Sequence, residues 1–518
     1  MGSRASRFWS RQRSENNQMS EEESGRADGT NIASSDDDED PALAMVLAFI
    51  LRNGHLDLMS SRSMRSRDSD DDNDAHAELS HRSNQLQRNT IRDNDLYQEM
   101  QLSTGSINPQ CKSISDRQYN ISHVLRQREA SCCGLNRKKN FTNGTCASVF
   151  SRHVPNDVIK RVSFHEKLFC GTYSDDGNTF LSACQDRTLR IYNTRKLSNK
   201  SMFKRIQARD IGWSVLDTAF SSDSRFVAYS SWSNYIHVCS VYDGDDPSLS
   251  VHSAHDLEPN HYNFAVFSLQ FSNDASEIIC AANDGYLYVY NLERGERTLK
   301  LDAHEDDVNA ICYADNRSHI IYSGGDDGLV KVWDRRILSD TTNASVGTLA
   351  GHQDGITYID TRGDSRYLLS NSKDQSAKLW DIRQFSSRST IDKVRQTVAE
   401  QRWDYRWESA PLCLTRKKPI PGDSSVMTYL GHHVRSTLIR ARFSPMHTTG
   451  NKYIYSGCSS GRVFVYDLLT GEVVSKLKKH EGCVRDVSWH PYENEFITSS
   501  WDKSFGLWMW KNENVDMA

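Results

Sequence analysis

One pattern of residues occurs twice in the sequence, as Tyr322-Ser-Gly-Gly-Asp-Asp-Gly-Leu-Val-Lys-Val-Trp-Asp-Arg-Arg336 and as Leu369-Ser-Asn-Ser-Lys-Asp-Gln-Ser-Ala-Lys-Leu-Trp-Asp-Ile-Arg383. In both copies an aspartate follows a serine by four residues, and a tryptophan follows that aspartate by six. The residues between the aspartate and the tryptophan alternate in polarity, as a β-strand with one buried face requires. Repetition of this kind indicates copies of one structural unit, so it has to be followed along the chain first.

The same frame recurs on both sides of this stretch. It matches Asp186 to Tyr192, Asp284 to Tyr290 and Asp502 to Trp508, and more weakly Ser460 to Tyr466 and Ser233 to Cys239. The seven copies end at residues 192, 239, 290, 333, 380, 466 and 508, mostly 42 to 51 residues apart, with one interval of 86. A four-stranded propeller blade takes about 40–45 residues. The sequence therefore predicts an all-β fold, a seven-bladed β-propeller with one insertion.

A histidine precedes several of these copies, and its offset resembles that of WD repeats. The resemblance implies that histidine, serine or threonine, aspartate and tryptophan form a structural hydrogen-bond chain within a blade. The sets are His304, Ser323, Asp327 and Trp333; His352, Ser370, Asp374 and Trp380; and His480, Thr498, Asp502 and Trp508. A catalytic triad is the alternative, but a set that repeats three times is not an active site.

The end of the chain predicts how the ring closes. Only ten residues follow Trp508, too few for a fourth strand in the last blade. A missing strand would leave an exposed edge. We therefore expect residues 158–164, which precede the first blade, to supply it.

The first 153 residues differ in composition from the propeller. Residues 1–40 read as a disordered acidic tail, and residues 60–153 as a polar linker with helical patches near 91–100 and 121–129. Between them, residues 41–59 form a predicted helix with Leu43, Leu47 and Ile50 on its apolar face. This helix could pack on its own propeller. The segments on both sides of it are polar and offer no core for its apolar face, which favours docking onto a partner protein.

The long interval corresponds to residues 384–430 within a propeller that we place at 154–518. This insertion has Trp-Asp but lacks the upstream serine and the alternation of a blade, so it is not an eighth one. Trp403, Tyr405 and Trp407 alternate with arginines there, a composition typical of interface anchors. We interpret them as target-binding residues. Packing on the propeller rim and a platform for single-stranded RNA are the alternatives.

Composition limits the remaining possibilities. The net charge of −5 does not indicate nucleic-acid binding, and no apolar run is long enough for a membrane span. The 12 cysteines include no Cys-x-x-Cys pair, which favours buried thiols in a reducing compartment and no metal site. No sequence motif for catalysis or for a cofactor is present. We expect a non-catalytic binding protein of the nucleus and cytoplasm.

Two arginines make that expectation more specific. Arg336 and Arg383 stand at the same position, two residues after Asp334 and Asp381, in consecutive blades. One such arginine would be explained by a loop carboxylate. A pair on one rim favours bidentate contacts with a partner.

These paired Trp-Asp-x-Arg ends, with the upstream helix, resemble the WD-repeat substrate receptors of cullin-four RING ubiquitin ligases. The resemblance covers the propeller well and residues 60–150 poorly. It implies binding to the damaged-DNA-binding protein one adaptor, and through it to the ligase, with protein substrates held for ubiquitination. The implied adaptor-binding residues are Trp333, Asp334, Arg336, Trp380, Asp381, Arg383, Leu43, Leu47 and Ile50. The alternative is a general WD-repeat scaffold for a chromatin or RNA-associated complex.

Overall fold

The computed structural model describes residues 94–104, 143–196, 201–242, 251–259, 263–339, 344–411, 414 and 419–512. The chain divides into two units. One of them, Arg4–Leu79, lies outside the described residues, and so do the predicted acidic tail and the predicted helix at 41–59. All described residues belong to the other unit.

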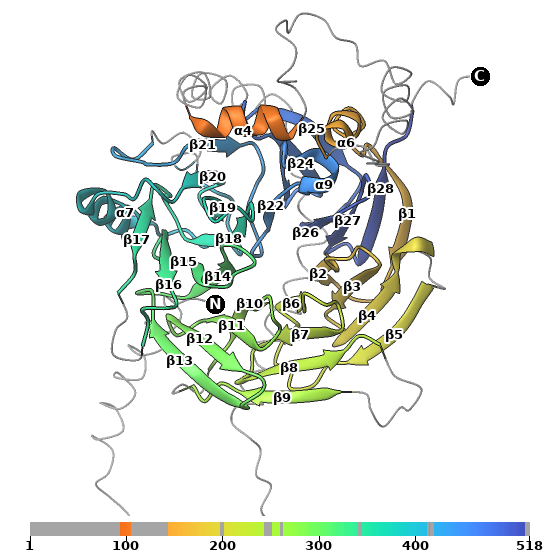
Figure 1. The fold of residues 1–518 in the computed structure, drawn as a ribbon, viewed down its shortest axis with the longest axis horizontal. Helices are drawn as coiled ribbons and strands as arrows, with labels where there is room; N and C mark the ends of the chain where they lie inside the picture. The colour runs from red at the N-terminus through yellow and green to blue at the C-terminus, as the bar shows by residue number, and fades with distance from the viewer. Residues whose placement is uncertain are drawn as a thin grey trace, which may run out of the picture. The chain divides into compact units, whose positions relative to one another are not determined.

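Seven antiparallel four-stranded sheets are arranged in a ring, as the sequence predicts (Figure 1). Blade 1 contains β2 (Leu168–Tyr173), β3 (Thr179–Cys184), β4 (Thr188–Asn193) and β5 (Met202–Gln207), with the short 3-10 helix Thr194–Lys196 after β4. Blade 2 contains β6 (Asp217–Phe220), β7 (Phe226–Ser230), β8 (Tyr235–Ser240) and β9 (His252–Asp256). Blade 3 contains β10 (Val266–Phe271), β11 (Glu277–Ala282), β12 (Tyr286–Asn291) and β13 (Glu296–Asp302).

The remaining blades follow the same strand order from the centre of the ring outward (Figure 1). Blade 4 contains β14 (Val308–Tyr313), β15 (Ile320–Gly325), β16 (Leu329–Asp334) and β17 (Gly347–Ala350). Blade 5 contains β18 (Ile356–Thr361), β19 (Tyr367–Ser372), β20 (Ser376–Asp381) and β21 (Met427–Leu430). Blade 6 contains β22 (Ala441–Phe443), β23 (Tyr453–Gly457), β24 (Arg462–Asp467) and β25 (Val473–Lys478). Blade 7 contains β26 (Val484–Trp489), β27 (Glu495–Ser500), β28 (Ser504–Met509) and β1 (Asp157–Ser163).

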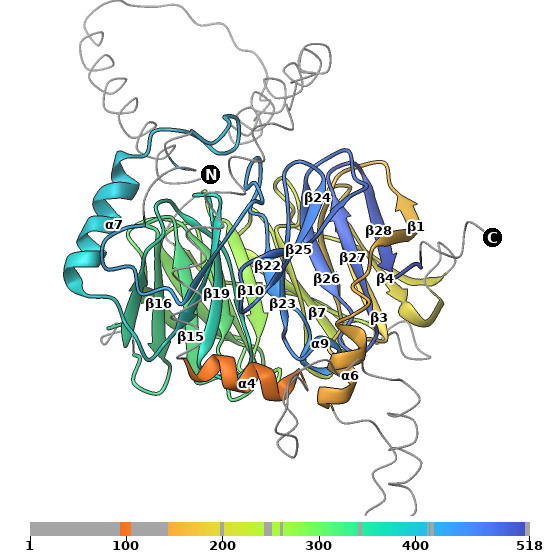
Figure 2. The same cartoon turned by 90° about the horizontal axis from the view of Figure 1, so that it is seen from above.

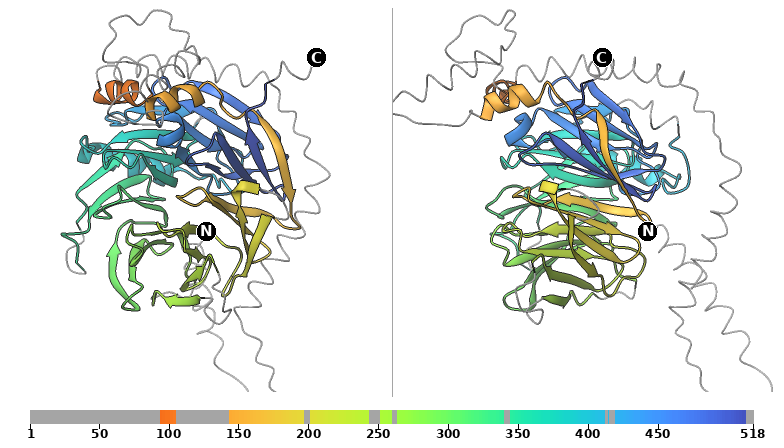
Figure 3. Two further views of the ribbon diagram at one scale, coloured as in Figure 1. Left: turned by 45° about the vertical axis from the view of Figure 1, so that its right-hand side comes forward. Right: turned by 90° about the vertical axis from the view of Figure 1, so that its right-hand side faces the viewer.

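Blade 7 joins the two ends of the propeller, as predicted. β1 pairs antiparallel with β28 from Asp157 opposite Met509 to Ser163 opposite Ser504, with one register shift near its start. Figure 3 shows β1 along the outer edge of the last blade. Val162 is buried against the core of blades 7 and 1, so β1 contributes packing as well as hydrogen bonds.

The predicted hydrogen-bond chain lies in the core of blade 5. His352 Nδ1 is 2.9 Å from Asp374 Oδ2, and His352 Nε2 is 2.7 Å from Ser370 Oγ. Ser370 Oγ also accepts from Trp380 Nε1 at 2.7 Å. Burial alone would raise the pKa of the Asp374 carboxyl, but His352 holds that pKa below its ordinary value. The equivalent chains in blades 4 and 7 are also formed, which confirms the structural interpretation of all three sets.

The insertion contains a helix that the sequence analysis missed. α7 (Arg388–Glu400) begins at Ser387, whose side chain accepts a hydrogen bond from the backbone N–H of Thr390. Val394 on this helix is fully buried in a small cluster with Leu329 and Ala350 of blade 4. Among the described residues of the insertion, Met427–Leu430 is the only strand, and it completes blade 5, so these residues do not form an eighth blade.

Three short helices gather on one face of the ring. Figure 2 shows α4 (Asp95–Ser103), α6 (Asn143–Phe150) and α9 (Met446–Thr449) on the same side. α4 confirms one of the two helical patches predicted in the linker, while the patch near 121–129 lies outside the described residues. α6 packs against α9, which follows β22 in blade 6. We call this side of the propeller the α4 face.

The described cysteines behave as small apolar residues. The seven whose side chains the structure describes are buried free thiols, as predicted: Cys170, Cys184, Cys239, Cys280, Cys312, Cys458 and Cys483. Among the helices in the described part of the chain, none has the length and apolar character needed to cross a membrane.

Candidate functional site

The two Trp-Asp-x-Arg ends lie where β16 and β20 leave their blades, on the α4 face. Asp334 accepts from the backbone N–H and from Nε of Arg336 at 3.1 and 2.9 Å through Oδ1, and from Nη2 at 2.6 Å through Oδ2. These hydrogen bonds from Arg336 lower the pKa of Asp334 to about 2. Asp381 holds Arg383 in the same way. Each aspartate therefore orients the guanidinium two residues later.

The members of the two motifs differ in what they offer a partner. Trp333 and Trp380 are buried within their blades, so their indoles cannot touch another protein. The side chains of Arg336 and Arg383 remain 64% and 54% exposed although both are paired. The arginines are thus the surface members of each motif, and the tryptophans support them from inside.

The same fork occurs elsewhere, which limits what it indicates alone. Arg406 pairs with Asp404 in the insertion, at 2.8 Å between Nε and Oδ1. Arg225 pairs with Asp223 in the turn between β6 and β7, at 2.6 Å between Nε and Oδ2. An arginine two residues after an aspartate therefore folds back in several turns of this chain. The fork alone therefore does not mark Arg336 and Arg383 as binding residues. What can distinguish them from the other arginines is the set of residues around them.

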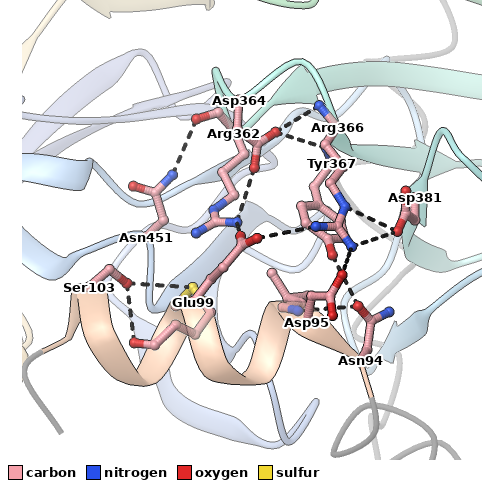
Figure 4. A network of polar contacts seen from close by, with 12 residues as sticks. Asn94, Asp95, Glu99, Ser103, Arg362, Asp364, Arg366, Tyr367, Asp381 and Asn451 are labelled. Atoms are coloured by element: carbon pink, nitrogen blue, oxygen red, sulfur yellow. Dashed lines mark hydrogen bonds and ion pairs between the residues drawn. The ribbon is translucent and has the colours of Figure 1, made fainter. Parts of the chain in front are cut away.

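Helix α4 brings acidic side chains to the blade 5 motif (Figure 4). Asp95 Oδ2 is 3.3 Å from Nη2 of Arg383 and 3.1 Å from Nη2 of Arg366. Glu99 then bridges Arg366 and Arg362, at 3.1 and 3.0 Å. We call Asp95, Glu99, Arg362, Arg366 and Arg383 the α4 network.

Two further features fix α4 on the propeller. Leu96 and Met100, one helical turn apart, are fully buried in the core shared by blades 5 and 6. At the helix start, Tyr367 Oη donates to Asn94 Oδ1 at 3.1 Å, and at its end Ser103 Oγ donates to the carbonyl of Gly450 at 3.2 Å. α4 is therefore a seated part of the α4 face.

The sequence analysis did not identify Asp95, Glu99, Arg362 or Arg366 as site residues. A signal was present on each side, because Asp95 and Glu99 are four residues apart within the helical patch and Arg362 and Arg366 are four apart in one turn. Nothing in the sequence paired the two segments, which are more than 260 residues apart.

The blade 4 motif has apolar neighbours. Ile337 directly follows Arg336 and is 57% exposed, and Val346 and Phe385 are also exposed. Phe385 lies against Gly347, where any side chain would collide with its ring. Exposed apolar side chains beside arginines are typical of interface centres.

The three aromatic residues predicted to bind targets lie in different surroundings. Trp403 is buried and donates from Nε1 to Asp354 Oδ2 at 2.9 Å. The ammonium nitrogen of Lys373 lies over the ring of Tyr405, 4.5 Å from the ring centre. Trp407 is 60% exposed. Trp403 and Tyr405 thus anchor the insertion, and Trp407 is the member that a target could reach.

A cavity of about 310 Å³ lies at the centre of the ring, lined by the first strands of blades 1 to 6 and by turns on the α4 face. Arg440 lines it and donates to Asp217 Oδ1 at 2.5 Å and to Asp486 Oδ2 at 3.1 Å. Arg442 also pairs with Asp486. These arginines are already paired with carboxylates of the chain, and they point to no particular ligand.

One group of possible metal ligands lies close together among the described residues: His490, Glu493 and Glu495. His490 Nε2 is 2.9 Å from the carbonyl of Gly177, and Nδ1 accepts from the backbone N–H groups of Tyr492 and Glu493. Both imidazole nitrogens form hydrogen bonds with the backbone, so His490 stabilises the turn and neither nitrogen is available as a metal ligand.

Known proteins similar to this chain share its propeller. The sequence matches the WD domain, G-beta repeat family over residues 144–193, 295–334, 343–381 and 471–508. It is 42% identical over 376 residues to the DDB1- and CUL4-associated factor 11 homolog of Caenorhabditis elegans, covering 71% of this chain and 65% of the relative. The homolog of the same name from Caenorhabditis briggsae is 38% identical over 384 residues, 71% of this chain and 68% of the relative.

A plant protein extends the comparison. The LEC14B protein of Lithospermum erythrorhizon is 39% identical over 399 residues, which cover 76% of this chain and 82% of the relative. The match to the nematode proteins spans only about two thirds of their length. The match to LEC14B, by contrast, includes most of that protein. This chain belongs to the WD-repeat family that includes the DDB1- and CUL4-associated factor 11 homologs and the LEC14B proteins.

Proposed function

We propose that this protein is a non-catalytic substrate receptor of a cullin-four RING ubiquitin ligase, and that it binds the DDB1 adaptor through the α4 face. The observation that carries the proposal is the pair of exposed arginines, Arg336 and Arg383, oriented by Asp334 and Asp381 in adjacent blades of one rim. The names of the nematode relatives, which refer to association with DDB1 and CUL4, support it.

The rim has the composition of a specific protein interface. The guanidinium of Arg336, oriented by Asp334, can make bidentate contacts with carboxylates or carbonyls of the adaptor. Ile337 and Phe385, exposed beside them, supply apolar area. The predicted helix at 41–59, with Leu43, Leu47 and Ile50 on one face, is proposed as a second adaptor contact.

The mechanism of such a receptor is positional. A target held on the propeller has a high effective concentration near the ligase, so its lysines are modified without chemistry by this chain. The face opposite the α4 face is proposed to hold the target. Trp407 is the best-placed member of the predicted aromatic set there, because its ring is exposed while Trp403 and Tyr405 are held by the propeller.

The proposal is tested by measuring the affinity of the full-length chain for purified DDB1. Arg336→Ala is expected to weaken binding tenfold or more, as loss of an interface arginine often does. Arg225→Ala is the matched control, because Arg225 makes the same fork with Asp223 on the same face but in blade 2. Deletion of residues 41–59 tests the second contact. Lack of binding by the unmodified chain would overturn the proposal.

A scaffold for a chromatin or RNA-associated complex is the competing function, and the same measurement separates the two. A scaffold unrelated to the ligase needs neither the arginine pair nor the 41–59 helix for its assembly. Residence in both nucleus and cytoplasm is proposed as well, and imaging of the tagged chain in cells tests it.

A further inference from the structure

The two motif arginines, equivalent in the sequence, have different surroundings. Arg336 pairs with Asp334, and its guanidinium has no other ion-pair partner among the described residues. Arg383 pairs with Asp381 and also with Asp95 of α4, 3.3 Å away. In blade 5, therefore, the chain itself supplies the carboxylate that a partner would have to supply in blade 4.

The second carboxylate belongs to a connected set of charges. Asp95 is shared between Arg383 and Arg366, and Arg366 also contacts Asp381 at 3.2 Å. Glu99 continues the set to Arg366 and Arg362 (Figure 4). Asp381 thus forms ion pairs with both Arg366 and Arg383, and these two arginines in turn contact Asp95 of the helix. Asp334 has no such role.

The position of α4 makes it part of the same surface as the motifs. Asp95 and Gln98 are exposed on the helix, and Asp95 contacts the half-exposed Arg383. A partner that reaches Arg383 must therefore also meet the first turn of α4. In blade 4 the corresponding surface consists of Arg336 and Ile337.

We propose that α4 is a component of the adaptor-binding face, and that Arg383 and Arg366 act by holding it there, while Arg336 contacts the adaptor itself. Arg383 is thus a positioning residue. This inference rests on the proposed adaptor binding, and it assigns the adaptor contact in blade 5 to α4.

Hydrogen exchange of residues 94–104 and adaptor affinity, measured on the same full-length variants, test this assignment. Arg383→Ala is expected to increase exchange in α4 several-fold and to weaken adaptor binding. Arg336→Ala is expected to weaken binding with the exchange of α4 unchanged. Arg225→Ala should change neither quantity, since its fork lies in blade 2, away from α4.

Combined variants give the sharpest test. Glu99→Lys opposes Arg362 and Arg366 and is expected to release α4 while the propeller core stays intact. In that background Arg383→Ala should cause little further loss of affinity, because both changes act through α4. Arg336→Ala should still reduce affinity by its full factor, because independent sites are additive.

Two results would overturn the inference. If Arg383→Ala weakens adaptor binding while α4 exchange stays unchanged, Arg383 contacts the adaptor directly. If Glu99→Lys releases α4 without loss of affinity, α4 is not part of the binding face. Failure of the unmodified chain to bind DDB1 is a different outcome: it overturns the proposed function and the adaptor role of α4, and the exchange data then still decide whether Arg383 holds the helix.

Discussion

Ser323 shows at the scale of one residue why the WD pattern is structural. Its hydroxyl lies 2.8 Å from His304 Nε2 and accepts from Trp333 Nε1 at 2.9 Å. A carboxylate can only accept, so His304 donates from Nδ1 to Asp327, and Nε2 accepts from the serine. The hydroxyl thus satisfies two buried nitrogen atoms at once.

We expect Ser323→Ala to lower the free energy of unfolding by about 2–6 kcal/mol. The substitution leaves two buried polar groups without a partner, and each costs roughly 1–3 kcal/mol. Chemical denaturation of the purified chain measures the change. Ser389→Ala, at an exposed position of the insertion, is the control. A loss below about 0.5 kcal/mol would contradict the role assigned to the hydroxyl.

His432 predicts a loss of stability in acid. It is buried between Tyr466 Oη, 2.9 Å from Nδ1, and Asn371 Oδ1, 2.8 Å from Nε2. Burial lowers its pKa to about 3. In the unfolded chain the pKa is the ordinary one near 6.5, so below that pH the unfolded state binds a proton that the folded state does not. Stability is therefore retained above about pH 6.5 and lost as the pH falls towards 3.

The expected slope is about 1.4 kcal/mol per pH unit from this histidine, between about pH 6 and pH 4. Urea denaturation at a series of pH values measures it. His432→Gln removes the titrating group and should reduce the slope by about that amount. An unchanged slope in the variant would show that other groups cause the acid sensitivity.

At the scale of elements, α4 and α7 are attached to the propeller by different means. α4 combines two buried apolar side chains, each worth about 1.5–3 kcal/mol, with ion pairs at the surface worth roughly 0.2–1 kcal/mol each. Leu96 and Met100 therefore supply a large part of the attachment energy of α4, and the ion pairs of the α4 network supply the rest. α7 depends on the apolar side chains of Ile391, Val394 and Val398.

We expect Val394→Asp to detach α7 from blade 4. A buried carboxylate without a partner is costly, so the helix should leave the cluster with Leu329 and Ala350. Limited proteolysis within residues 384–430 should become at least several-fold faster, while the propeller stays folded. Adaptor binding should be unchanged, since α4 is attached at a different site. Protease resistance equal to that of the unmodified chain would contradict this attachment.

What could be predicted from the sequence follows from how far apart the interacting residues lie. The blades were predictable because serine, aspartate and tryptophan of one hydrogen-bond chain fall within eleven residues, as from Ser323 to Trp333. The strand at 158–164 followed from counting strands. α7 was not predicted, although Ile391, Val394 and Val398 have the spacing of one helical face. The aromatic residues that follow were interpreted as interface residues, and the apolar spacing before them was not used.

The position of α4 on the propeller could not be deduced in the same way. Its helical tendency was visible, but its partners lie in a turn of blade 5, and only the closed ring brings Arg362 and Arg366 beneath it. Arg383 differs from Arg336 because α4, in that position, brings Asp95 against it. In the sequence the two Trp-Asp-x-Arg motifs are indistinguishable.

At the scale of the whole molecule, the ring depends on β1. Without it, β28 would be an unpaired edge strand, and such edges pair with other chains. We expect a chain that starts at residue 167 to be markedly less stable and to self-associate, compared with one that starts at residue 154. Thermal unfolding and light scattering measure both properties. Both chains lack α4 and α6, so the comparison isolates β1.

Closure through β1 also has a consequence for synthesis on the ribosome. The partner of Asp157–Ser163 is Ser504–Met509, so the first strand of the propeller is made more than 300 residues before the strand it pairs with. At about 5–20 residues per second, β1 waits tens of seconds or more for that partner. During this interval each completed blade can pack on the previous one, but the ring stays open with two free edges. The nascent chain is therefore most exposed to misassociation just before Ser504–Met509 emerge, when the other strands of the propeller are already made.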